Sequence, residues 1–186
     1  MELVDLYNEE RIPLGKSVER YAQRRRKDSG EYRVVVHICI FNSAGEMLLQ
    51  QRSMKKDAFP GMWDVSAAGG IRAGENSRQG AEREVREELG LTVSCGELLF
   101  VVEGVAGEAF HRVDLVFACD YLSEAPGASL HTDTNQVGVE WLDVEKLLHT
   151  PLYPSRLRRQ IMNYAHGLPH KVYLGNENAG DPEYLD

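Results

Sequence analysis

The segment GGIRAGENSRQGAEREVREELGL (69–91) constrains the fold of this chain most, because it joins a glycine-rich loop to a full set of helix signals. Asn76 is suited to cap the start of the helix, and Gln79 follows at the three-residue spacing of a capping box. Gly90 is suited to end the helix, because glycine adopts the left-handed conformation beyond the last turn without strain. The sequence therefore predicts a loop followed by a helix that begins near Asn76 and ends at Gly90.

Three carboxylates follow one face of this predicted helix. At 100° per residue, Glu84, Glu87 and Glu88 fall within an arc of about 100°, beside an apolar stripe that can pack on the rest of the protein. Carboxylates this close repel one another, so we expect a cation between them. Oxygen ligands select Mg²⁺, Mn²⁺ or Ca²⁺, and Mg²⁺ usually completes its shell with waters and substrate phosphates. We predict a divalent-metal site for diphosphate chemistry; the alternative is a solvated acidic helix face.

The same segment resembles the Nudix box at every fixed position. The matching residues are Gly69, Glu75, Arg83, Glu84, Val85, Glu87, Glu88, Gly90 and Leu91. The chain is therefore identified as a member of the Nudix family. This resemblance implies an α/β (α+β) fold, in which a mixed β-sheet is sandwiched between α-helices, and a metal-dependent attack of water on a diphosphate.

The resemblance also assigns roles within the box. It implies that Glu84, Glu87 and Glu88 bind the metal, with the carbonyl of Gly69 as a fourth ligand. The expected cofactor is Mg²⁺, with Mn²⁺ as the alternative. Glu84 or Glu87 is the expected catalytic base, and the sequence does not choose between them. Glu75 and Arg83, the other charged positions of the box, are expected to brace the loop against the helix.

Residues 5–90 resemble one branch of the family, the isopentenyl diphosphate isomerase-like proteins. The resembling stretches are VDLYNEERIPLGKSVERY, VHICIFNSAGEMLLQQRS and KKDAFPGMWDVSAAG. By this resemblance, Arg52 and Lys56 bind the substrate diphosphate. Two cations on a strand end and the adjoining loop suit a phosphate cradle, although ordinary surface charges are the alternative.

The departures from the isomerases favour hydrolysis. Isomerases carry a cysteine followed by Gly-His at the start of the box, whereas this chain has Ala68, Gly69 and Gly70. We therefore predict a Mg²⁺-dependent hydrolase that cleaves a diphosphate linkage in a small molecule such as a nucleoside di- or triphosphate or a prenyl diphosphate. The alternatives are an isomerase that uses Cys39 or Cys119, and a non-catalytic module that senses a nucleotide.

Some polar residues outside the box are candidates for further site residues. Many Nudix enzymes use an additional acid from the loop before the last strand, and HTDTNQVGVE offers Asp133, Gln136 and Glu140 there. A glutamine occupies the position where the acid is expected. His37 and His111 each lie in a predicted strand, so we interpret both as packed or surface residues.

Composition limits the compartment and the partners. The net charge of −8 argues against nucleic acid or an anionic membrane as a partner, which leaves a small-molecule diphosphate. No apolar run approaches 18 residues and no secretory signal is present. Cys39, Cys95 and Cys119 are scattered and odd in number, as expected for buried thiols of a cytoplasmic protein without disulfide or zinc. The N-terminal segment could supply a homodimer contact.

The chain is predicted to fold as one domain with extensions at both ends. We expect an N-terminal extension packed on the core (1–30), a Nudix domain (31–175) and a flexible tail (176–186). Outside the box, the predicted elements are strands at 3–7, 32–41, 47–52, 98–103, 111–122 and 139–142, helical segments at 144–149 and 155–165, and loops at 55–63 and 123–136.

Overall fold

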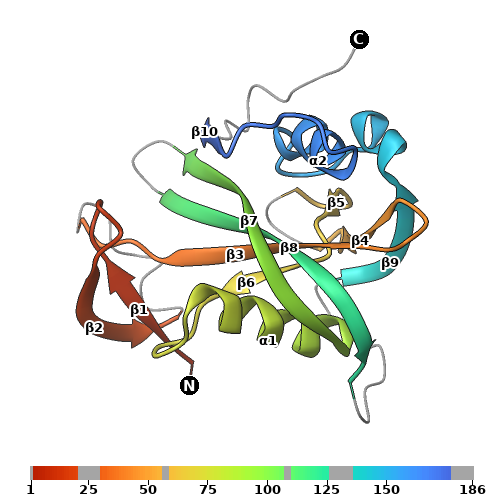
Figure 1. Cartoon of the computed structure of the whole chain (residues 1–186). Helices are drawn as coiled ribbons and strands as arrows, with labels where there is room; N and C mark the ends of the chain where they lie inside the picture. Colours follow the sequence, from red (N-terminus) through yellow and green to blue (C-terminus); the bar gives the residue numbers. More distant parts are fainter. Residues whose placement is uncertain (1, 21–29, 56–58, 107–109, 126–135, 177–186) are drawn as a thin grey trace.

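The computed structural model of the chain describes residues 2–20, 30–55, 59–106, 110–125 and 136–176 (Figure 1). The strands are β1 (Leu3–Tyr7), β2 (Pro13–Glu19), β3 (Val34–Phe41), β4 (Glu46–Arg52), β5 (Trp63–Asp64), β6 (Ala67–Gly70), β7 (Leu91–Ala106), β8 (Phe110–Glu124), β9 (Gln136–Asp143) and β10 (Tyr173–Asn176). The helices are α1 (Ser77–Leu89), the 3₁₀-helix η3 (Val144–His149) and α2 (Leu157–Ala165).

A mixed sheet forms the centre of the fold. Its strands follow the order β10-β7-β8-β3-β4-β5, and in addition β6 pairs with β3 and β9 pairs with β4. Strand β3 runs parallel to β8 but antiparallel to β6, and β10 runs parallel to β7. Helix α1 covers one face of the sheet and α2 covers the other (Figure 1). The predicted fold, a mixed sheet between helices, is confirmed.

Strand β3 shows how one sequence supplies both cores. Successive side chains of a strand point to opposite faces, and β3 reads as a nearly continuous apolar run because both faces are covered. Ile38 and Ile40 are fully buried in the core beneath α1, whereas Cys39 is fully buried in the core beneath α2. The apolar stripe of α1, which includes Val85 and Leu89, completes the first of these cores.

The ends of helix α1 form as the sequence predicts. The side chain of Asn76 accepts a hydrogen bond from the Gln79 N–H at 3.0 Å, and the Gln79 side chain accepts one from the Asn76 N–H at 2.9 Å. Gly90 ends the helix with φ of 63°, in the left-handed region. Within the described ranges, no helix combines the length and apolar character needed to span a bilayer.

An N-terminal hairpin, β1 and β2, lies beside the loop that joins β6 to α1 (Figure 1). The N–H of Ala73 donates to the Leu3 carbonyl at 2.9 Å, and the N–H of Gly74 donates to Asp5 Oδ2 at 2.9 Å. The Asp5 carboxylate also accepts from the Ser17 hydroxyl, and these bonds lower the pKa of Asp5. The hairpin therefore holds the box loop from outside the central sheet.

Several predicted boundaries need correction. The predicted strand at 98–103 is part of β7, which begins at Leu91 directly after α1, because β8 continues to pair with it. Strand β2 was not predicted, because it forms through pairing with β1. Strand β10 was not predicted, since only its pairing with β7 identifies it. Residues 177–186, 56–58 and 126–135 of the predicted tail and loops lie outside the described residues.

All three cysteines are buried and free, as predicted. Cys95 and Cys119 are directly opposite each other on β7 and β8, and both belong to the core beneath α1. Cys39 lies in the other core, where burial raises the pKa of its thiol. Burial keeps all three thiols away from reagents in solution.

We expect Asn76→Ala to lower the free energy of unfolding by about 1 kcal/mol, because the Gln79 N–H loses its capping partner. Urea denaturation monitored by circular dichroism would measure the loss. Arg78→Ala, an exposed change in the first turn of the same helix, is the control and should alter stability by less than about 0.5 kcal/mol. Equal effects of the two substitutions would contradict the capping role.

Candidate metal and diphosphate site

Helix α1 places its three predicted metal ligands at different depths. Glu84 is buried with 5% of its surface exposed, and Glu88 is partly buried. The Glu87 side chain is 45% exposed. The packing of the apolar stripe explains this gradient, because it turns the Glu84 side of the helix toward β6 and leaves Glu87 at the open edge.

Gly69 and Glu84 are in direct contact, as the box predicts for neighbours in one site. A Cβ atom built at Gly69 would lie 2.1–2.4 Å from the carboxylate atoms of Glu84. Only glycine leaves room for that carboxylate against strand β6. The requirement for glycine here is therefore one of space.

Glu88 accepts hydrogen bonds from two uncharged groups. Its Oε2 accepts from the Gln50 side chain at 3.1 Å and from the Ala68 N–H at 3.2 Å. Burial, together with the nearby Glu84 carboxylate, raises the pKa of Glu88 to about 8 against the opposing effect of the two donors. Burial also raises the pKa of Glu84, against the opposing effect of Arg83. Both carboxylates would be stabilised by a bound cation, which fits a metal site.

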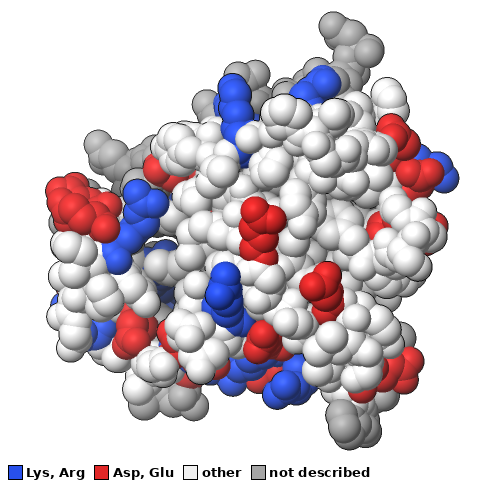
Figure 2. All heavy atoms as spheres, in the orientation of Figure 1, with Lys and Arg blue, Asp and Glu red and all other residues white. Residues whose placement is uncertain are grey.

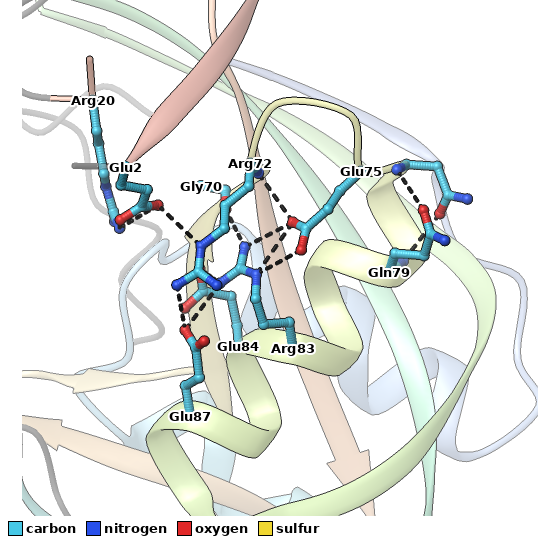
Figure 3. Close-up of polar contacts among 10 residues, drawn as sticks. Glu2, Arg20, Gly70, Arg72, Glu75, Gln79, Arg83, Glu84 and Glu87 are labelled. Carbon is cyan, nitrogen blue, oxygen red and sulfur yellow. Dashed lines mark hydrogen bonds and ion pairs between the residues drawn. The ribbon is translucent and has the colours of Figure 1, made fainter. Parts of the chain in front are cut away.

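In this structure the Glu87 carboxylate is held by two arginines at the exposed edge of the site. Its Oε2 accepts from Arg72 Nη2 at 3.0 Å and from Arg83 Nη1 at 3.2 Å (Figure 3). Among the residues that the structure describes, no three histidine, cysteine or acidic side chains are already grouped around a metal position. The complete ligand set from the sequence therefore stays a prediction, of which the structure brings together Gly69, Glu84 and Glu88.

Arg83 connects the loop, the strand and the helix of the box (Figure 3). It donates to Glu75 Oε1 at 2.9 Å, to the Gly70 carbonyl at 2.8 Å and to Glu84 Oε1 at 2.7 Å. Burial would raise the pKa of Glu75, but hydrogen bonds from Arg83 and the Arg72 N–H outweigh it and lower that pKa. These contacts are the brace between loop and helix that the box predicts.

The N-terminal hairpin adds a cation that the sequence did not identify. Arg20 Nη1 donates to both carboxylate oxygens of Glu2, at 3.1 and 3.0 Å. Its guanidinium lies 3.9–4.0 Å from where a Cβ would stand at Gly70. Burial raises the pKa of Glu84, and the charge of Arg20 opposes part of that rise. No local pattern marks Arg20, because only the folding of the hairpin onto the box loop brings it to the site.

Arg52, the predicted diphosphate ligand on β4, is held by a carboxylate. Its Nη1 donates to Asp64 Oδ2 at 2.8 Å. Asp64 stands opposite Gln50 on the paired strands β4 and β5, and its charge raises the pKa of Glu88. Arg52 is thus on the Glu88 side of the site, whereas its predicted companion Lys56 lies outside the described residues.

Of the other candidate residues, the structure describes the side chains of His37 and Glu140. His37 is buried, as predicted, with Nε2 at 3.5 Å from Asp114 Oδ2. Burial would raise the pKa of Asp114, but His37 and Arg112 outweigh it and lower that pKa. Glu140 is exposed on β9. Asp133 and the side chains of Gln136 and His111 lie outside the described part of the chain.

Comparison with known proteins agrees with this geometry. The NUDIX domain family model matches residues 31–163, a range that contains strands β3 to β9, helix α1 and most of α2. The chain belongs to the Nudix family. The family identified from the box is therefore confirmed, and the match also includes strands β3 to β9 on either side of it.

Relatives of this Nudix chain include both branches considered from the sequence. An uncharacterized Nudix hydrolase of Listeria innocua is 47% identical over 93 residues, which are 50% of this chain and 53% of that protein. The isopentenyl-diphosphate Delta-isomerase of Escherichia coli is 26% identical over 157 residues, 80% of each chain. This chain spans about half the length of the Listeria relatives that it matches.

Solved structures share the fold. The crystal structure of a MutT protein from Methanosarcina mazei superposes with a TM-score of 0.58 at 25% identity, covering 73% of this chain and 94% of that one. A NUDIX hydrolase from Nitrosomonas europaea superposes with a TM-score of 0.61 at 21% identity, covering 75% of this chain and 92% of that one. The second likeness concerns the fold alone.

We expect the stability of the metal-free protein to fall, relative to Glu88→Gln, as pH rises from about 4.5 to about 8. The folded state keeps a proton on Glu88 that the unfolded chain releases near 4.5, so this contribution is lost as pH passes the folded pKa. Urea denaturation in chelator at pH 5, 7 and 9 would measure it. A difference between the two proteins that is independent of pH would refute the raised pKa.

We expect Gly69→Ala to fold but to bind Mn²⁺ about 10- to 100-fold more weakly, since the new Cβ displaces the Glu84 carboxylate. Isothermal titration calorimetry would measure the affinity. Gly70→Ala is the matched control, because its Cβ meets Arg20 at 3.9 Å, an ordinary contact. Similar losses in both variants would show that spacing at Gly69 is not the cause.

Proposed function

We propose that this protein is a Mg²⁺-dependent Nudix hydrolase, with Mn²⁺ as an alternative metal, that cleaves a diphosphate linkage in a small molecule. The observation that carries this proposal is a pair of carboxylates on α1 that are removed from solvent: Glu84 lies against Gly69 and is paired with Arg83, and Glu88 accepts hydrogen bonds from the Gln50 side chain and the Ala68 N–H. Burial of two like charges is unfavourable unless a positive charge is supplied, and a divalent ion supplies it.

Glu84, Glu87 and Glu88 would hold the metal, together with the Gly69 carbonyl. When bound, the metal supplies neutralisation of phosphate charge and a lowered pKa for a coordinated water. Arg83 fixes the orientation of Glu84, and burial around Glu84 strengthens every charge interaction there. Glu84 and Glu87 are the two candidates for the catalytic base. Burial raises the pKa of Glu84, a direction that favours a proton acceptor.

Cations from two sides of the site would bind the substrate diphosphate. Arg52 approaches from β4 beside Glu88, and Lys56 follows it in the chain. Arg20 approaches from the hairpin beside Gly70. Nucleoside di- or triphosphates and prenyl diphosphates are the substrate classes that we propose, because both present a diphosphate to these cations.

The two alternatives have less support. An isomerase needs an acid-base pair, but Ala68 and Gly70 stand at the start of the box, and Cys39 and Cys119 are buried in apolar cores. A module that only binds a nucleotide does not need a carboxylate that activates water. The complete set of acids in the box therefore favours hydrolysis.

We also propose a cytoplasmic protein that acts on a small molecule and does not bind nucleic acid or membrane. Three buried free thiols are typical of a reducing compartment, and the net charge is −8. Acidic and basic side chains are interspersed over the face in Figure 2 instead of forming one basic patch. The hairpin exposes Leu3, Ile12 and Leu14, which supports a homodimer contact that sedimentation would test.

We expect Mg²⁺-dependent release of phosphate or pyrophosphate from at least one member of a panel of nucleotides, isopentenyl diphosphate and dimethylallyl diphosphate. Glu88→Gln should lower that rate at least about 100-fold, because it removes a charged metal ligand. Chelator should abolish the release in the wild type. Turnover of no compound, together with ligand binding that survives Glu88→Gln, would favour the sensing module instead.

A further inference from the structure

Glu87 accepts hydrogen bonds from two arginines that differ in exposure and in their number of other partners (Figure 3). Arg83 is also committed to Glu75, Glu84 and the Gly70 carbonyl, with 12% of its side chain exposed. Arg72 is 40% exposed, and its Nε lies at a longer distance, 3.9 Å, from Glu2 Oε1. Of the two partners of Glu87, Arg72 can therefore move with less disturbance.

The Glu2 carboxylate places a second arginine beside Arg72. Glu2 Oε1 lies 3.1 Å from Arg20 Nη1 and 3.9 Å from Arg72 Nε, so the two guanidinium groups share one carboxylate. Arg20 in turn stands beside Gly70, next to the proposed metal ligands. Without metal, Arg20 and Arg72 are balanced by two carboxylates, Glu2 and Glu87.

A metal ion would change this balance. A divalent cation that takes the Glu87 carboxylate competes with Arg72 for the same oxygen atoms and repels its guanidinium. Arg72 then loses its closer partner and keeps only its 3.9 Å approach to Glu2, a carboxylate that Arg20 also contacts. A guanidinium presents a planar fork of N–H donors that matches a phosphate, so an anionic phosphate group is the ligand that this arrangement would accept.

We propose that Arg72 is a diphosphate-binding residue whose availability is controlled by the metal. It pairs with Glu87 when the metal is absent and binds the substrate's phosphate oxygens once the metal occupies Glu87. Metal and diphosphate then bind cooperatively through one arginine. This proposal rests on the proposed function for the identity of its ligand.

The loop keeps Arg72 within reach in both states. The Arg72 N–H donates to Glu75 Oε2 at 3.0 Å, and the next residue, Ala73, donates to the Leu3 carbonyl of the hairpin at 2.9 Å. The backbone at this position is thus held from the box on one side and from the hairpin on the other. Only the side chain needs to turn from Glu87 toward a phosphate.

Arg72→Gln tests the proposal through two affinities that should change in opposite directions. Mn²⁺ alone should bind about two- to fivefold more tightly, because a partly exposed competing ion pair is removed. Methylenediphosphonate, which is not hydrolysed at its P–C–P bridge, should bind about tenfold more weakly at saturating Mn²⁺. Isothermal titration calorimetry on the full chain would measure both.

Arg78→Gln is the matched control, since it removes the same charge from an exposed position at the start of α1. It should leave both affinities within about twofold of the wild type. A fall in both affinities of Arg72→Gln, or no change in either, would overturn the role of Arg72. If the wild type binds neither Mn²⁺ nor methylenediphosphonate, the proposed metal and diphosphate site fails as well.

Discussion

The contacts of Arg83 are the interaction on which the rest of the site depends. One planar guanidinium links the loop through Glu75, the end of β6 through the Gly70 carbonyl, and the helix through Glu84. These parts come from different elements, so their distances from one another are fixed by a shared side chain. The close approach of Glu84 to Gly69 is possible only because this spacing is held. Five donors in a rigid fork are well suited to such a role.

Helix α1 combines this charged arrangement with a large share of the core. Its residues Ala81, Val85 and Leu89 are fully buried against the sheet, and the acidic side chain of Glu84 is buried beside them. Burial of a leucine or valine side chain contributes roughly 1.5 to 3 kcal/mol, which offsets part of the cost of desolvating a carboxylate. The site is therefore stabilised by packing on one side of the helix, while Arg83 holds Glu84 and uncharged donors hold Glu88 on the other.

The N-terminal hairpin bears on the choice between the proposed hydrolysis and isomerisation. It contacts the box loop through Leu3 and Asp5 and brings Arg20 to Gly70. At the position where the isomerases carry histidine, this chain therefore has a glycine with an arginine beside it. A cation at this place can bind an anion but cannot exchange protons near neutral pH, because a guanidinium stays charged. This difference agrees with hydrolysis and not with isomerisation.

The sequence by itself determined the family, the mixed α+β fold, the capped helix α1, the strands β3 and β4, and the approach of Gly69 to Glu84. These features depend on local spacing, on alternation of apolar residues and on a box whose positions are fixed relative to one another. Only the tertiary structure decided that Glu87 is turned toward Arg72, that Arg52 is paired with Asp64, and that Arg20 belongs to the site. Strand β10 likewise became apparent only through its partner β7. Each of these depends on contacts between segments distant in the chain, and long-range charge pairing leaves no periodic signal in the sequence.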